Sequence, residues 1–134
     1  MKILIDTNII IDVALQREPF LLNSEAVLIQ VEEKQVEGYV SAATFSDIYY
    51  IINKTRGKDW TLTFLNRLYS FCQVATVNTA VIEMALNSNF RDFEDAIQYS
   101  VAVINNLDVI VTRNPKDFPV SYPQILTPSQ LISN

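Results

Sequence analysis

Short apolar runs alternate along this chain with longer stretches of helical periodicity. The runs Lys2–Ile5, Gly38–Ser41 and Asp108–Thr112 are predicted to be buried strands. Val74–Val77 is a shorter candidate strand, and Tyr122–Leu126 is expected to add an edge strand. Apolar runs of this length, bounded by turn residues, are typical of strands that are covered on both faces.

Helices are expected between these strands. Phe45, Ile48, Tyr49 and Ile52 recur at the spacing of one helix face, with Ser41 as the N-cap. The segment before Gly38 has an apolar face at Ala26, Ile29 and Val36, and Gly38 is suited to stop that helix. The predicted helices are Asn8–Leu15, Leu21–Glu37, 42–56 before Gly57, Asp59–Phe71, Thr79–Leu86, Phe93–Asn105 and Pro128 to about Ile132.

The order of these elements predicts the fold class. Strands that alternate with helices are typical of an α/β fold, in which helices cover both faces of a parallel sheet. The chain has 134 residues and no linker or repeat, so a single domain over residues 1–134 is expected.

Composition excludes several kinds of chemistry. The chain has no histidine, which excludes a Ser-His-Asp triad, a histidine base and a histidine zinc site. It has two glycines and no glycine-rich phosphate loop, and its single cysteine permits no disulfide. No signal-like or membrane-spanning run is present, so a soluble, cytoplasmic protein without membrane contact is expected. The net charge of −5 opposes RNA binding unless basic side chains gather locally.

Asp6 is the first candidate for chemistry. It follows the first strand, and ligands bind at the carboxyl edge of parallel sheets. Thr7 and Asn8 come next and are expected to hold the Asp6 side chain or to order water. The alternative is that Asp6 is an ordinary solvated helix cap.

Further acids follow other predicted strands or begin helices. Asp47 is either part of the same site or a polar surface residue. Asp92 and Asp95 are three residues apart and share a helix face, whereas Glu94 is expected to point elsewhere. Both aspartates would also complement the dipole of their helix, which is the alternative reading.

The segment after the last core strand contains both acidic and basic residues. Asn114 and Asp117 either belong to the site or form an ordinary Asn-Pro turn. Arg113 and Lys116 flank the acidic residues and are expected to contact a negatively charged substrate.

Several acids at one edge of a sheet repel one another unless a cation lies among them. Ligation by oxygen atoms alone favours Mg²⁺ or Mn²⁺ over zinc. Such a metal can activate water and stabilise charge on a phosphoryl oxygen, so metal-assisted phosphodiester hydrolysis is the leading hypothesis.

These motifs resemble those of the PIN-domain nucleases. The resemblance rests on Asp6-Thr7-Asn8, on Ser41 with Asp47, on the F-E-D-A-I-Q run that contains Asp95, and on T-R-N-x-x-D-F at 112–118. The last two motifs are similar to those of a bacterial subgroup that resembles the toxins of type II, virulence-associated protein BC-type, toxin–antitoxin systems.

The resemblance implies a three-layer α/β/α sandwich with a mostly parallel central sheet of four or five strands. It implies an endoribonuclease that depends on Mg²⁺ or Mn²⁺, with RNA as substrate, a small antitoxin as partner and often a homodimer. The metal-binding and catalytic acids would be Asp6, Asp47 and Asp95. The supporting or fourth positions would be Asn114, Asp117, Thr7, Asn8 and Thr112.

Two positions depart from the family pattern. The second acid is more often Glu in the family and is Asp47 here, while the fourth position is commonly Asp and is Asn114 here. Asparagine offers an oxygen but no charge, which leaves open one metal or two. It also leaves open a PIN-like module that binds RNA or protein without cutting.

Overall fold

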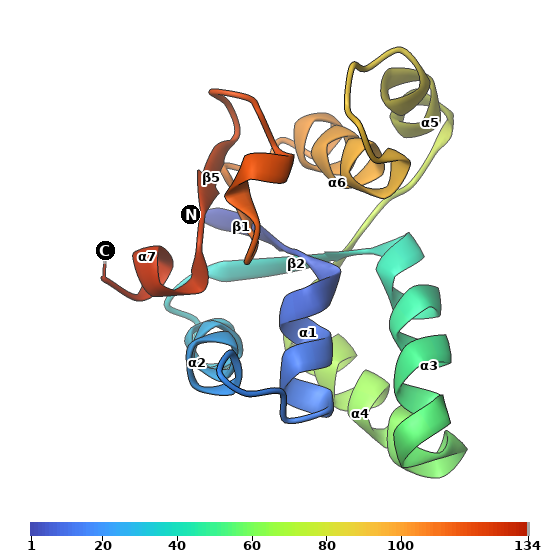
Figure 1. The fold of residues 1–134 in the computed structure, drawn as a ribbon, viewed down its shortest axis with the longest axis vertical. Helices are drawn as coiled ribbons and strands as arrows, with labels where there is room; N and C mark the ends of the chain where they lie inside the picture. Colours follow the sequence, from blue (N-terminus) through green and yellow to red (C-terminus); the bar gives the residue numbers. More distant parts are fainter. Residues whose placement is uncertain (134) are drawn as a thin grey trace.

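A five-stranded parallel sheet forms the centre of the protein, which a computed structural model describes over residues 1–133 (Figure 1). The strands lie in the order β3-β2-β1-β4-β5, and every neighbouring pair is parallel. Their bounds are β1 Lys2–Ile5, β2 Glu37–Ser41, β3 Gln73–Ala75, β4 Val109–Val111 and β5 Gln124–Leu126. The predicted α/β fold with a parallel sheet of four or five strands is confirmed.

Helices cover both faces of this sheet. In Figure 1, α5 and α6 lie above the sheet, and α1 to α4 lie below it. The helix bounds are α1 Thr7–Ala14, α2 Leu21–Glu32, α3 Ala42–Arg56, α4 Lys58–Phe71, α5 Thr79–Leu86, α6 Phe93–Ile104 and α7 Pro128–Ser133, with a short 3-10 helix, η1, at Pro115–Asp117. Within residues 1–133, none of these helices has the length and apolar character needed to cross a membrane.

The strands divide the hydrophobic core into two clusters. Along β1, Ile3 and Ile5 pack with α1, α2 and α3, whereas Leu4 packs against residues of α5 and α6. The same alternation occurs in β4, where Ile110 shares the Leu4 cluster. Successive side chains of a strand point to opposite faces of the sheet, so β1 and β4 each contribute to both clusters.

The predicted helix over Leu21–Glu37 is too long. Helix α2 ends at Glu32, and Glu37 already pairs with Lys2 in the sheet. The predicted apolar face is also wrong, because Val27, Leu28 and Val31 are buried while Ile29 is 43% exposed. The chain leaves the helix before Glu37 because pairing with β1 outweighs the helical spacing of the apolar residues.

Gly38 lies within β2 and does not end the preceding helix as predicted. It pairs with Ile3 of the central strand, where α2 packs closely on the sheet. A Cβ atom at this position would lie 2.5 Å from Cγ1 of Val31, so only glycine fits unless Val31 shifts. Gly57, in contrast, ends α3 as predicted, with a φ of 83° that favours glycine.

Candidate active site

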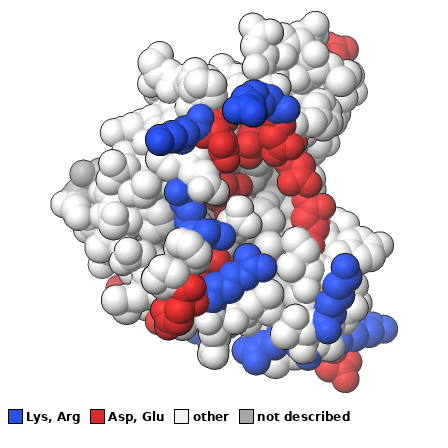
Figure 2. Space-filling model, in the orientation of Figure 1, with Lys and Arg blue, Asp and Glu red and all other residues white. Residues whose placement is uncertain are grey.

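A cavity of about 450 Å³ opens at the carboxyl edge of the sheet, between α1, α3, α6 and the segment after β4. No Lys or Arg of the described chain lines it. Figure 2 shows acidic side chains around a central hollow and basic side chains near its edge. Six carboxylates line the cavity: Asp6, Asp47, Asp92, Glu94, Asp95 and Asp117.

Asp6 is the most firmly held of these acids. It is 8% exposed and caps α1, where its Oδ1 accepts a hydrogen bond from the Thr7 amide at 2.9 Å. Gln98 Nε2 of α6 donates to the same oxygen at 3.3 Å, and Thr112 Oγ1 donates to Oδ2 at 2.8 Å. Both carboxylate oxygens are therefore oriented by groups from three separate segments.

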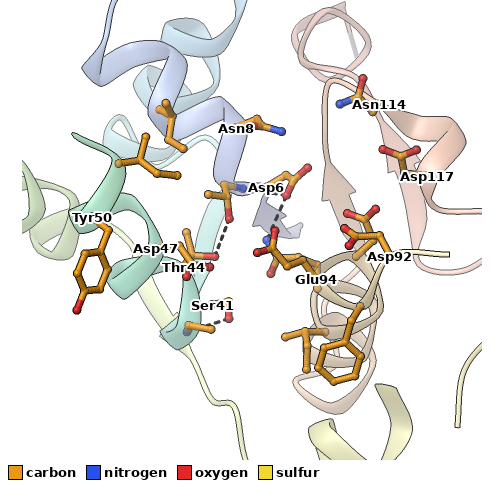
Figure 3. A pocket seen from close by; sticks show the side chains of 18 residues that line it. Asp6, Asn8, Ser41, Thr44, Asp47, Tyr50, Asp92, Glu94, Asn114 and Asp117 are labelled. Carbon is orange, nitrogen blue, oxygen red and sulfur yellow. Dashed lines mark hydrogen bonds between the residues drawn. The ribbon is translucent and has the colours of Figure 1, made fainter. Parts of the chain in front are cut away.

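Helix α3 brings Asp47 to the wall of the cavity that faces α6 (Figure 3). Ser41 caps this helix as predicted, accepting a hydrogen bond from the amide of Ala43 at 3.2 Å. Thr44 shares a hydrogen bond of 3.0 Å with Thr7, which ties α3 to the start of α1. Asn8 lines the cavity beside them.

The start of α6 brings three acids into the cavity, Asp92, Glu94 and Asp95. The prediction that Glu94 points elsewhere is wrong. Asp92 is the N-cap and has extended backbone angles, so the helical spacing that set Glu94 apart does not apply across 92–95. Figure 3 shows Glu94 between Asp6 and Asp47, on the side of the cavity formed by α6.

Burial, together with the neighbouring carboxylates, favours the protonated forms of Asp95 and Glu94. Burial raises the pKa of Asp95 to about 7, and the nearby charges of Asp92, Asp6 and Asp117 act in the same direction. Burial also raises the pKa of Glu94, with contributions from Asp47, Asp92 and Asp6. Bringing this many like charges into one cavity costs free energy that a bound cation would offset.

Asn114 and Asp117 reach the same cavity from the segment after β4. The Asn114 amide donates a hydrogen bond to Thr112 Oγ1 at 3.1 Å, on the hydroxyl that also holds Asp6. Asp117 is the last residue of η1. The structure thus gathers all of the predicted acids and Asn114 around one volume.

The two basic candidates lie outside the cavity. Arg113 was predicted to flank the acids, but its Nε lies 2.8 Å from Oδ2 of the buried Asp12 and its guanidinium covers the Phe20 ring. A buried carboxylate needs a positive charge nearby. The side chain of Arg113 therefore points toward Asp12 and away from the cavity. Lys116 is exposed on η1 and does not line the cavity.

Sequence reasoning assigned no role to two polar residues that shape the site, Thr44 and Gln98, although Gln98 ends the F-E-D-A-I-Q run. Gln98 is buried three residues after Asp95, on the same face of α6, and Thr44 is buried three residues before Asp47. The signal that could have identified them is helical spacing from a predicted acid. Gln98 Oε1 is buried and has no hydrogen-bond partner among the described residues.

The donor set fits a hard divalent cation. Carboxylates surround the cavity, and Gln98, whose buried Oε1 has no hydrogen-bond partner among the described residues, lies among them. Oxygen ligands of this kind suit Mg²⁺ or Mn²⁺. In residues 1–133 no three acids are already arranged with metal-binding geometry, so side chains such as Asp47 and Asp95 would have to turn toward a common point.

Comparison with known proteins identifies the family. A model of the PIN domain matches residues 2–116. The chain belongs to the PIN-domain family. No curated protein matches it significantly.

Solved structures share this PIN fold. A toxin–antitoxin complex from Klebsiella pneumoniae is 24% identical, with 93% of this chain and 96% of that chain covered and a TM-score of 0.71. VapBC2 from Rickettsia felis, bound to a promoter DNA fragment, is 16% identical, with 95% and 98% covered and a TM-score of 0.68. The Mycobacterium tuberculosis toxin VapC20, which cleaves the sarcin-ricin loop, is 14% identical, with 81% and 86% covered and a TM-score of 0.64.

The raised pKa of Asp95 predicts a pH-dependent stability in EDTA. The folded protein keeps a proton that the unfolded chain loses above pH ~4. This favourable contribution is complete below about pH 4 and is lost progressively until about pH 7, above which Asp95 is ionised in both states. Between about pH 4 and about pH 7, the unfolding free energy should therefore fall more steeply in the wild type than in Asp95→Asn, by up to about 1.4 kcal/mol per pH unit.

Urea denaturation at a series of pH values measures this difference. Asp59→Asn removes a carboxylate at the start of α4, outside the cavity, and should keep the wild-type slope. Equal slopes for the wild type and Asp95→Asn would show that Asp95 does not hold the extra proton.

Proposed function

We propose that this chain is an endoribonuclease that requires Mg²⁺ or Mn²⁺ and acts as the toxin of a type II toxin–antitoxin pair. The observation that carries the proposal is the cavity lined by six carboxylates at the carboxyl edge of a PIN fold. The fixed orientation of Asp6 supports it, because a carboxylate held by three donors needs little reorganisation to bind a cation.

In this proposal Asp6, Asp47 and Asp95 would hold the metal. When bound, a divalent cation would supply charge stabilisation at the phosphodiester and would activate water. Thr112 and Gln98 keep Asp6 in its ligating orientation. Glu94 lines the same cavity and is not one of the three proposed ligands, so its carboxylate is free to exchange a proton during hydrolysis.

RNA is the proposed substrate. The similar protein VapC20 is a toxin that cleaves the sarcin-ricin loop. The net charge of −5 requires local basic side chains for RNA binding, and such side chains lie near the edge of the hollow in Figure 2. Lys116, exposed beside Asp117, remains a candidate for phosphate contact, whereas the inward-facing Arg113 does not.

An antitoxin and a second copy of the chain are the proposed protein partners. One of the similar structures is a toxin–antitoxin complex, and a second, VapBC2, is bound to a fragment of its promoter DNA. An apolar groove of about 230 Å³ between α1, α2 and α4 offers an antitoxin a surface, lined in part by Val13, Leu28, Ile29, Phe64 and Phe71. Trp60 and Tyr69 of α4 are exposed and suit a contact between two copies.

Sedimentation tests both partners. The chain alone at tens of micromolar should sediment as a dimer, and it should form a larger complex with the product of a small gene immediately upstream. A chain that sediments as a monomer and does not bind this product would contradict the proposed assembly.

Removing either of two acids should stop cleavage. Asp6→Asn and Asp95→Asn each remove a charge that would hold the cation, so RNA cleavage with Mn²⁺ should fall about a thousandfold or more, equivalent to about 4 kcal/mol. Both variants should remain folded by circular dichroism, since each substitution keeps the size of the side chain. Cleavage of a labelled RNA measures the rate, with Asp59→Asn as the matched control.

Two outcomes would contradict this account. Near wild-type cleavage by either variant would remove that acid from the metal site. A wild-type protein that binds RNA but does not cut it with any divalent ion would instead support a PIN-like binding module. The sequence feature that favours this alternative is Asn114, at a position where the family commonly has Asp.

Asn114 should matter less than the three acids. A neutral side chain can only order water or make a weak oxygen contact, so Asn114→Ala should reduce cleavage about tenfold, far less than Asp6→Asn. Asn114→Asp adds an attractive charge and should tighten Mn²⁺ binding, with the largest gain at low metal.

Calorimetric titration of Mn²⁺ into the wild type, Asn114→Asp and Asp117→Ala distinguishes the possible fourth ligands. If Asp117→Ala loses metal while Asn114→Asp gains none, Asp117 is the fourth ligand and the geometry proposed for Asn114 is wrong.

A further inference from the structure

A second charged cluster lies inside the protein, next to the acidic cavity but separate from it. Asp12 of α1 is fully buried, and its Oδ2 accepts a hydrogen bond from Ser24 Oγ of α2 at 3.0 Å. Nε of Arg113 lies 2.8 Å from the same oxygen, and the guanidinium carbon lies 3.9 Å from the centre of the Phe20 ring. None of these four residues lines the cavity.

Arg113 lies between Thr112 and Asn114, two residues that contribute to the site around the cavity. Thr112 Oγ1 donates to Asp6 and accepts a hydrogen bond from the amide of Asn114. Asn114 lines the cavity. The side chain between them points the other way, toward Asp12. Asp6 caps the helix that contains Asp12, so both connections of this segment lead back to α1.

This ion pair differs from the other one in residues 1–133. The pair between Arg67 and Glu32 is largely exposed, with 70% and 43% of the side chains accessible, and such pairs contribute little. Asp12 is 0% exposed, and its charge is compensated by the hydrogen bond from Ser24, by Arg113 and by the nearby charge of Arg17. The planar guanidinium, stacked on Phe20, further restricts the direction of Arg113.

We infer that the ion pair between Asp12 and Arg113 is a positioning device for the active site. It fixes the backbone of 112–114 against α1, and thereby holds the Thr112 hydroxyl on Asp6 and keeps Asn114 at the cavity wall. The catalytic consequence rests on the proposed nuclease function. The structural consequence, a firmly held Asn114 amide, does not.

Hydrogen exchange of the Asn114 amide tests the structural step in EDTA. Arg113→Gln removes the counter-charge, and the Asn114 amide should then exchange about tenfold faster or more. Arg113→Lys keeps a positive charge near Asp12 and should restore most of the protection. Asp12→Asn provides a second route, since it removes the charge but keeps a polar partner for Ser24.

Val81→Ala is the control for general loss of stability. Val81 is fully buried on α5, and its truncation weakens the core without touching α1 or 112–114. An unchanged Asn114 exchange rate in both Arg113→Gln and Asp12→Asn would overturn the inference. So would an equal acceleration in Val81→Ala at a matched loss of stability.

Turnover tests the catalytic step, at a temperature where every variant is folded by circular dichroism. In Arg113→Gln and Asp12→Asn, kcat for RNA should fall about tenfold while KM stays within about twofold, because positioning acts on the reacting groups. Val81→Ala should keep the wild-type kcat. Wild-type turnover by both ion-pair variants would overturn catalytic positioning.

The two measurements separate this inference from the proposed function. If the wild type cuts no RNA but the Asn114 amide loses protection only in the ion-pair variants, the nuclease proposal fails and the positioning role stands. If the wild type cuts RNA and neither readout changes in the ion-pair variants, the nuclease proposal stands and the positioning role fails.

Discussion

The carboxylate of Asp6 is the fixed point around which the site is built. It follows β1, which lies between β2 and β4, so the segments after both neighbouring strands can reach it. The Asp6 amide continues the pairing to Val111, and the carboxylate accepts hydrogen bonds from Thr7, Gln98 and Thr112. A parallel sheet creates this geometry because all of its strands end at the same edge.

Like charge is the main cost of this arrangement. Six acids share one cavity, and the pKa values of Asp95 and Glu94 rise because burial and neighbouring carboxylates disfavour their ionised forms. Among residues 1–133 no Lys or Arg lines the cavity, and Arg113 pairs with Asp12 in the core instead. The protein therefore separates two electrostatic tasks, an acidic cavity suited to a cation and a neutral, internally paired cluster that supports its wall.

Local signals in the sequence predicted most of the fold and the candidate acids. Apolar runs marked the strands, and Ser41 and Gly57 marked the limits of α3, because caps act within a few residues. The errors arose where contacts between residues far apart in the sequence determine the structure. The end of α2 and the place of Gly38 depend on pairing with β1 and on the packing of Val31. The direction of Arg113 depends on Asp12, far away in sequence, and no local pattern specifies that partner.

In the proposed site, one divalent cation binds in the acidic cavity on Asp6, Asp95 and Asp47. A crystal of the protein soaked in Mn²⁺, with anomalous scattering recorded for manganese, would locate this ion. We expect one strong anomalous peak at coordination distance from carboxylate oxygens of Asp6 and Asp95, with Asp47 turned toward it. An empty cavity at saturating Mn²⁺, or a peak bound only by residues outside the cavity, would show that these acids do not form the metal site.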